Sequence, residues 1–167
     1  MWARSDVPVW WGDGVTSNSA DQPADPVQDL LAAFPGVRID PDNSAHYQGL
    51  LERRLLINRC AGCSTWHHPP RPVCPECWSS TVEAHEVAGS GTVALLTILR
   101  QGPRQPGVDY QQGHVLVAVE LDEQPGLRVS GTVVGLAADQ VRLGDRVGLV
   151  WTDIDGRAPR PDFEVIR

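Results

Sequence analysis

The sequence predicts a mainly β protein with N-terminal helices, in which a small four-cysteine ribbon precedes a closed barrel of the OB-fold type. Helical periodicity ends before residue 55, all four cysteines lie within residues 60–77, and strand-like runs follow from residue 82 onward. The predicted divisions are an irregular N-terminal arm (1–24), a helical segment (25–54), the ribbon (55–81) and the OB-fold barrel (82–167).

The composition is that of an acidic globular protein without a long apolar segment. The 167 residues are 41% hydrophobic and 21% charged, and the formal net charge is −7. Glycine and proline supply 16 and 14 residues, which favours many turns over long helices. Neither a signal peptide nor an apolar run of about 18 residues is found, so we expect a cytoplasmic protein with no membrane span.

Two short helices are predicted before the ribbon. Residues 25–34 combine an Asp-Pro start, suited to an N-cap and a first turn, with apolar residues at i, i+3, i+4 and i+7. A second helix is expected over residues 44–54, with Tyr47, Leu50 and Leu51 on one face. Both helices should therefore pack an apolar stripe against the rest of the protein.

The four cysteines form two Cys-x-x-Cys pairs separated by ten residues. Two such knuckles offer four thiolates to one tetrahedral ion, and a reducing cytosol favours metal over disulfides. A complete Cys₄ set leaves no open position for water, which indicates a structural site. Zinc is favoured, and iron, which takes the same ligands, is the alternative. The predicted metal ligands are Cys60, Cys63, Cys74 and Cys77.

The segment WHHPPRP between the knuckles contains two histidines that are possible ligands on paper. Because four thiolates already complete a tetrahedron, His67 and His68 are predicted to be packing or surface residues. Trp66 and Trp78 are expected to cover the metal or to form an apolar contact outside it. A ribbon this short buries little core, so the metal should supply much of its folding energy.

Five or six strands are predicted after the ribbon. Residues 92–99 have strand composition, and residues 114–121 (HVLVAVEL) are so apolar that we expect a strand covered on both faces. Apolar and polar residues alternate over 127–133 and 147–151, as on a strand with one buried face. A last short strand is indicated near residues 163–165. This number of strands fits a small closed barrel, and the OB-fold is the natural candidate.

Charge argues against nucleic-acid binding, although OB-folds and zinc ribbons often serve it. The net charge is −3 over residues 1–59, zero over 60–81 and −4 over 82–167. Affinity for nucleic acid depends largely on neutralising phosphates, and no basic stripe is present.

No nucleophile motif is found in the sequence, and the histidines outside the ribbon are scattered. The sequence therefore predicts no active site of its own.

Two regions outside the regular elements are candidate contact sites. Trp10 and Trp11 lie in the N-terminal arm, where they either belong to an irregular tail or dock on a partner, as tryptophan anchors commonly do. The loop of residues 101–113 is long for a hairpin. Through Tyr110 it either reaches a ligand or partner, or is simply mobile.

A set of segments in fixed order gives a family resemblance over about residues 44–153. The segments are HYQGLLERRLLINRC, CAGC and HPPRPVCPEC, followed by GSGTV, VAVELDE and VRLGDRV. They resemble a family of small proteins in which a rubredoxin-like zinc ribbon precedes an OB-fold and which accompany thiolase-type enzymes of acyl-CoA metabolism. His46–Gly49 departs from the family's common Phe-Trp-x-Gly, and Trp78 replaces the usual glycine after the last cysteine.

The resemblance implies an accessory subunit whose four cysteines are the metal ligands. In actinobacterial steroid side-chain aldolases, such a protein pairs with a lipid-transfer-protein-like subunit of thiolase fold. That complex performs retro-aldol cleavage of a steroid side-chain CoA thioester, and its catalytic residues lie mainly on the thiolase-fold subunit. For this chain the resemblance implies the same kind of partner, a heterotetramer, and a CoA thioester as the substrate of the complex.

Two other functions stay open at this point: an accessory subunit of a thiolase or acyltransferase, and a stand-alone acyl-CoA-binding module. Candidate contacts with a partner or with CoA, besides Trp10 and Trp11, are Tyr47, Arg59, Arg71 and Tyr110. Arg53 and Arg54 also flank the ribbon and could meet phosphates. Surface solubility is the alternative role for each of these arginines.

Overall fold

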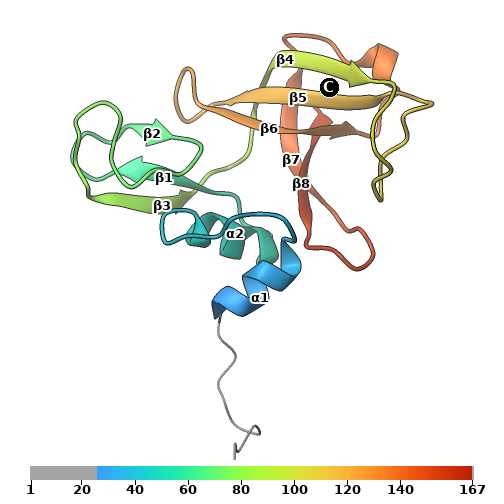
Figure 1. The fold of residues 1–167 in the computed structure, drawn as a ribbon. Helices are drawn as coiled ribbons and strands as arrows, with labels where there is room; N and C mark the ends of the chain where they lie inside the picture. The colour runs from blue at the N-terminus through green and yellow to red at the C-terminus, as the bar shows by residue number, and fades with distance from the viewer. Residues whose placement is uncertain (1–25, 167) are drawn as a thin grey trace, which may run out of the picture.

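In the computed structural model, which describes residues 26–166, two helices and a three-stranded ribbon lead into a closed five-stranded barrel (Figure 1). The predicted mainly β architecture with N-terminal helices is confirmed. The elements are α1 (Pro26–Ala33), α2 (Ser44–Leu51), β1 (Leu56–Cys60), β2 (Trp66–His67), β3 (Val82–Glu86), β4 (Gly91–Leu99), β5 (His114–Leu121), β6 (Arg128–Val134), the 3₁₀ helix η1 (Ala138–Gln140), β7 (Arg146–Thr152) and β8 (Arg160–Val165). Among the described residues, no helix has the length and apolar character that a membrane crossing requires.

The two helices lie together beside the ribbon and contact each other through aromatic rings. The ring centroids of Phe34, just after α1, and Tyr47 in α2 are 4.9 Å apart. Leu30 is buried as expected, but Leu31 is 42% exposed, so the apolar stripe of α1 is only partly covered. α2 ends at Leu51, three residues before the predicted end, since Arg53 has a positive φ of 57° that no α-helix continues.

The ribbon is an antiparallel sheet in the order β2-β1-β3. β1 pairs with β3 along its whole length, from Leu56 opposite Glu86 to Cys60 opposite Val82. The sheet therefore extends past residue 81, where the sequence places the end of the ribbon. The reason is that the chain leaving the second knuckle returns beside the strand that leads into the first.

The barrel strands are ordered β4-β5-β6-β8-β7 and close through pairing of β4 with β7. β6 and β8 are parallel, and the other neighbouring pairs are antiparallel. Along β5 the valines at 115, 117 and 119 are buried, whereas Leu116 is 38% exposed. The expectation that both faces of β5 are covered is wrong, because Leu116 on the outer face is left partly open in a hollow between β4, β5 and β6.

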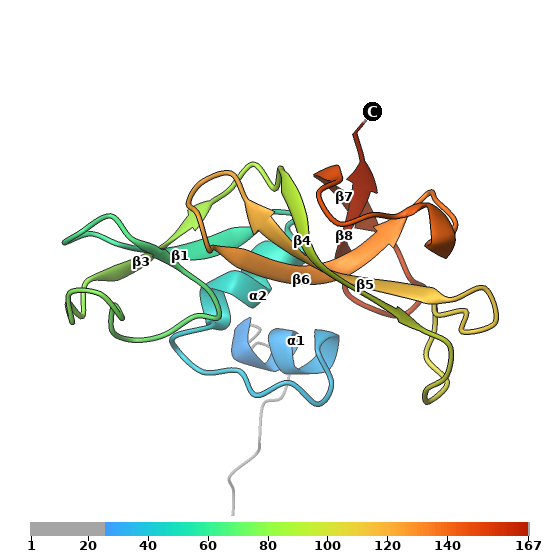
Figure 2. The same ribbon diagram turned by 90° about the horizontal axis from the view of Figure 1, so that it is seen from above.

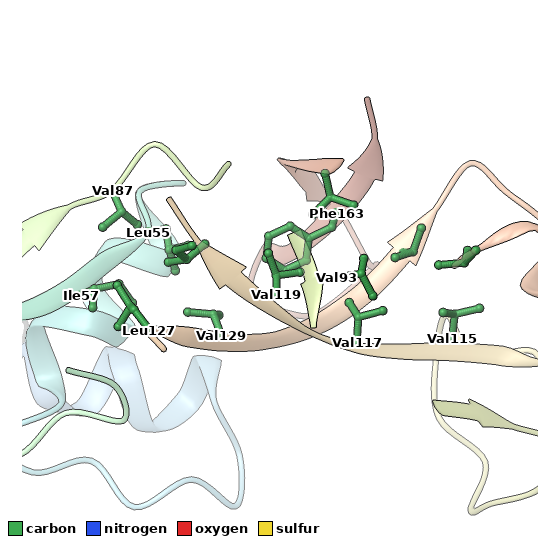
Figure 3. Packing of buried hydrophobic residues seen from close by; sticks show 14 of the residues in the cluster. Leu55, Ile57, Val87, Val93, Val115, Val117, Val119, Leu127, Val129 and Phe163 are labelled. Carbon is green, nitrogen blue, oxygen red and sulfur yellow. The ribbon is translucent and has the colours of Figure 1, made fainter. Parts of the chain in front are cut away.

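One continuous core joins the ribbon to the barrel. Leu55, Ile57 and Val87 from the ribbon side belong to the same buried cluster as Leu127 and Val129 of the β5–β6 region (Figure 3). The view from above shows the ribbon and helices lying against one side of the barrel (Figure 2). The ribbon is therefore fixed on the barrel by packing rather than attached by a free linker.

Polar links fasten the same junction at its edges. The side chain of Gln124, in the turn between β5 and β6, accepts a hydrogen bond from the Trp66 N–H at 2.9 Å and donates one to the Trp66 carbonyl at 3.0 Å. One guanidinium nitrogen of Arg53 donates to both carboxylate oxygens of Asp153, at 2.6 and 2.9 Å. This ion pair joins the end of α2 to the loop after β7. Both links join segments that are distant in the sequence.

Candidate metal centre

The four predicted cysteines converge on one point at the tip of the ribbon. Their Sγ atoms all lie within 4.8 Å of one another. The Cys60–Cys77 and Cys63–Cys74 Sγ pairs are each 3.6 Å apart. A tetrahedral ion bound at about 2.3 Å from each sulfur needs sulfur–sulfur edges of about 3.8 Å, whereas a disulfide needs about 2.05 Å. The geometry fits one tetrahedral metal ion and not a pair of disulfides.

The two knuckles share one backbone conformation, which explains how they present two sulfurs each. Ser64 N–H donates to the Cys60 carbonyl at 2.9 Å, and Trp78 N–H donates to the Cys74 carbonyl at 3.1 Å. Both turns end on a left-handed residue, with φ of 63° at Ser64 and 62° at Trp78. Trp78 is 80% exposed, so the expectation that it covers the metal or forms an apolar contact is wrong for this residue.

Local hydrogen bonds favour the thiolate forms of Cys60 and Cys63, whereas the pKa of Cys77 is raised to about 12 next to these two sulfurs. The hydroxyl of Thr65, 3.2 Å from the Cys63 Sγ, and the Thr65 backbone lower the pKa of Cys63 to about 6. The backbone N–H of Cys63 lowers the pKa of Cys60, and the Gly62 N–H donates to the Cys60 Sγ at 3.3 Å. Because metal binding displaces thiol protons, both effects assist loading at neutral pH.

The histidines between the knuckles lie outside the sulfur cluster. His67 is only 7% exposed, and neither ring nitrogen has a hydrogen-bond partner in the described structure. Its predicted packing role is confirmed. His68 contacts His46 of α2, with ring centroids 5.2 Å apart, and its Nδ1 is also buried without a partner. Burial, followed by the nearby His46, lowers the pKa of His68 to about 4.

His68 should make the protein less stable in mild acid. Its folded pKa of about 4 lies below the ordinary histidine value of 6.5, so between these values the unfolded chain binds a proton that the folded chain does not. Stability from this group is complete above pH 6.5 and falls by up to about 1.4 kcal/mol per pH unit on acidification. We expect denaturant unfolding of the native chain, with the metal supplied in excess, to show a steeper loss between pH 6.5 and 5 than His68→Gln.

The matched control for this comparison is His85→Gln, because the side chain of His85 is 45% exposed on β3 beside Glu83. It should keep the pH dependence of the native chain. Equal slopes for the native chain and His68→Gln would contradict the assignment.

The other predicted contact residues are not brought together in one site. Arg59 lies over the Trp66 ring at 5.3 Å, and Arg71 is exposed on the ribbon. The hydroxyl of Tyr110 donates to the Pro103 carbonyl at 3.1 Å, so it braces the 101–113 loop from within. Arg53 and Arg54 are engaged in ion pairs with Asp153 and Glu86. Trp10 and Trp11 lie outside the described residues.

Tyr47 instead lines an apolar groove that sequence reasoning missed. The groove, of about 320 Å³, lies between the helices and the loop joining β7 to β8, and its walls include Phe34, Ile154, Pro159 and Pro161. Phe34 and Tyr47 are more than a hundred positions away from the β7–β8 residues in the sequence. The proline-rich APRP segment at 158–161 is the sequence feature that marks one wall of the groove. It does not indicate which helical residues form the opposite wall.

The four-sulfur ribbon and the closed barrel together define a two-part protein, a zinc ribbon followed by an OB-fold. Residues 48–83 match the family model described as "ChsH2, rubredoxin-like zinc ribbon domain", and residues 84–152 match "ChsH2, C-terminal OB-fold domain". The chain belongs to this ChsH2 family of DUF35 proteins. The family resemblance and fold predicted from the sequence are thereby confirmed.

Relatives with described roles fall into two groups. Over 132 residues the chain is 35% identical to a "Probable enoyl-CoA hydratase alpha subunit" of Thermomonospora curvata, covering 79% of this chain and 40% of that protein. The chain thus spans less than half the length of that relative. It is 30% identical over 110 residues to a "DUF35 domain-containing scaffold protein" of Methanocaldococcus jannaschii, covering 65% of this chain and 75% of the relative.

Two solved structures share the fold. One, described as "Ltp2-ChsH2(DUF35) aldolase", has a TM-score of 0.68 and 35% identity, covering 77% of this chain and 98% of that chain. The other is a DUF35 protein of unknown function from Sulfolobus solfataricus, with a TM-score of 0.55 and 15% identity, covering 84% of this chain and 96% of that chain. The second supports the fold alone.

Proposed function

We propose that this protein is a non-catalytic accessory subunit of a thiolase-fold, lipid-transfer-protein-like aldolase that cleaves steroid side-chain CoA thioesters by a retro-aldol reaction. The observation that carries the proposal is the similarity to a chain of the structure described as an Ltp2-ChsH2(DUF35) aldolase. The match covers 98% of that chain. The scaffold proteins among the relatives support the accessory role. The proposed assembly is a heterotetramer, built on a dimer of the thiolase-fold subunit.

The chemistry of the reaction supports a division of labour between two subunits. Retro-aldol cleavage needs a base for the β-hydroxyl group and donors that stabilise an enolate at the thioester. The four thiols lie together in the candidate metal centre, and burial lowers the pKa of His67 and of His68. A lowered pKa makes an imidazole a weaker base, so we assign these roles to the partner.

This chain would supply rigidity and shape. The continuous core and the Gln124 and Arg53 links hold the ribbon, helices and barrel as one body. A rigid body docked beside an active site can exclude water and fix the position of catalytic loops. We propose zinc as the ion at the four cysteines, where it would stabilise the ribbon without taking part in the reaction.

An uncovered apolar hollow on the barrel is the proposed contact with the partner. Leu95 is 57% exposed and Leu116 is 38% exposed, and both line a hollow of about 260 Å³ on the outer face of β4 and β5. They are diagonal neighbours, because Leu116 pairs with Thr97 and Leu95 with Ala118. Exposed apolar side chains grouped in this way commonly mark protein interfaces.

Co-expression with the thiolase-fold subunit tests the proposal. The two chains should co-elute from size-exclusion chromatography at low micromolar concentration, and cleavage of a steroid side-chain CoA thioester should require both. Leu116→Glu should weaken association at least tenfold, because it places a charge in the apolar hollow. Leu143→Glu is the control, since Leu143 is 65% exposed and lies outside the hollow.

Four results would contradict the proposal or the interface that it names. If this chain elutes alone at that concentration, the two proteins are not stable partners. If this chain alone gives full turnover, it is not an accessory subunit. Binding of a CoA thioester by the isolated chain, without any association, would favour a stand-alone binding module. If Leu116→Glu and Leu143→Glu associate equally well with the partner, the interface lies on another face of the protein.

A further inference from the structure

The groove between the helices and the β7–β8 loop is an apolar surface with no cover among the described residues. Most of its lining is apolar, including Phe34, Tyr47 and the prolines at 106, 159 and 161. The two charged side chains in the lining, Arg157 and Arg160, are both basic. A contiguous apolar hollow of this kind usually has an occupant.

The charge of the groove selects for an acidic occupant. Arg157 is exposed and has no carboxylate partner among residues 26–166, whereas Arg160 is paired with the buried Asp162. Asp155, in the same loop, offsets part of this charge, and Asp153 is already neutralised by Arg53. The unmatched arginine at the rim would therefore favour an apolar segment flanked by carboxylates.

The chain itself carries such a segment. Residues 6–13 read DVPVWWGD, an apolar run ending in two tryptophans with an aspartate on either side. Residues 1–25 contain four aspartates and one arginine, a net charge of −3. Left uncovered, five consecutive apolar residues with two indole rings would be a hazard for non-specific association.

The connection to the fold makes docking in the same molecule favourable. Residues 1–25 join the described fold at Pro26, the start of α1, and Ala33 at the other end of that helix lines the groove. An eight-residue helix is about 12 Å long, and the 15 residues from Trp11 to Pro26 span up to about 50 Å. Tethering of this length gives an effective concentration of about 1 mM, so even a contact with a Kd of about 0.1 mM would be occupied about ten times more often than empty.

We propose that residues 6–13 dock in this groove of their own chain, with Trp10 and Trp11 against the Phe34, Tyr47 and proline surface and the flanking aspartates towards the arginine rim. This proposal stands apart from the aldolase assignment, because it concerns the isolated chain and needs no partner.

Hydrogen exchange followed by mass spectrometry on the full-length chain tests the docking. The amides of Phe34 and Arg157 give local reporters, since they donate to the Leu30 and Ile154 carbonyls at the groove walls. Replacing both tryptophans (W10S/W11S) should speed exchange at residues 33–37 and 154–161 by up to about tenfold. Conversely, Ala158→Glu, which places an acid in the groove, should speed exchange within residues 6–13.

Matched variants separate docking from general loosening. Trp2→Ser lies outside the segment, and Ala137→Glu changes an exposed alanine outside the groove, so both should leave these rates unchanged. The proposal is overturned if W10S/W11S leaves exchange at the groove walls unchanged. It is also overturned if the protection rises with protein concentration, because the occupant is then a second copy.

Discussion

Replacing Cys74 with serine is expected to cost the protein its metal and its folded ribbon. The Cys74 side chain is fully buried, its Sγ lies 3.6 Å from that of Cys63, and the sequence has no fifth cysteine that could replace it. Structural zinc contributes about 10–16 kcal/mol of apparent binding energy in small peptides, as much as the whole stability of a typical domain. Elemental analysis should find one zinc per native chain and close to none in Cys74→Ser.

The loss should also reach the barrel, because Leu55 and Ile57 share its core. We expect Cys74→Ser to lower the unfolding midpoint of the whole chain, measured by circular dichroism in denaturant. Ser80→Ala, an exposed ribbon position, is the control and should behave as the native chain. A Cys74→Ser protein that keeps one ion and an unchanged midpoint would refute the four-sulfur centre, and iron in the native chain would refute zinc.

Phe163→Ala is expected to destabilise the barrel by about 3–5 kcal/mol. The ring is completely buried at the point where β8 joins β6 to β7, and a Cβ added at Gly131 would lie only 2.7 Å from it. A large ring packed this closely leaves a cavity when it is removed, and β6 and β7 both lose contacts. Chemical denaturation with saturating zinc measures the effect separately from metal binding.

Phe163→Leu is the matched comparison, because it keeps most of the apolar volume at the same position. Its loss of stability should be clearly smaller than that of the alanine variant. A Phe163→Ala protein within about 1 kcal/mol of the native chain would mean that the barrel collapses around the vacated space.

The parts of the fold that depend on local patterns were predictable. The cysteine spacing predicted that the four sulfurs come together, because knuckle geometry is set within four residues, and period-two alternation located β6 and β7. α2 was predicted too long, because the left-handed turn at Arg53 has no signal in its residue type. β5 reads as fully buried because Leu116 and Ala118 make the middle of its outer face apolar, and a sequence does not distinguish a face covered by its own chain from an uncovered one.

The features that depend on tertiary contacts could not be predicted. The groove is formed by residues within 33–50, 105–106 and 154–161, which come together only when the helices fold onto the barrel. Trp78 has a left-handed backbone conformation and is 80% exposed. Neither the sequence spacing nor the residue types indicate these arrangements.

The shared core of ribbon and barrel limits how this protein can be re-engineered. The two halves match separate family models that meet at residues 83 and 84. These boundaries suggest residue 83 as the junction for a chimera. Such a cut falls inside β3, whose pairing with β1 runs from Val82 to Glu86, and it separates Trp66 from Gln124. A graft between relatives would therefore have to carry Gln124 and the Leu127 contact surface along with the ribbon, so the transplantable unit is larger than either half.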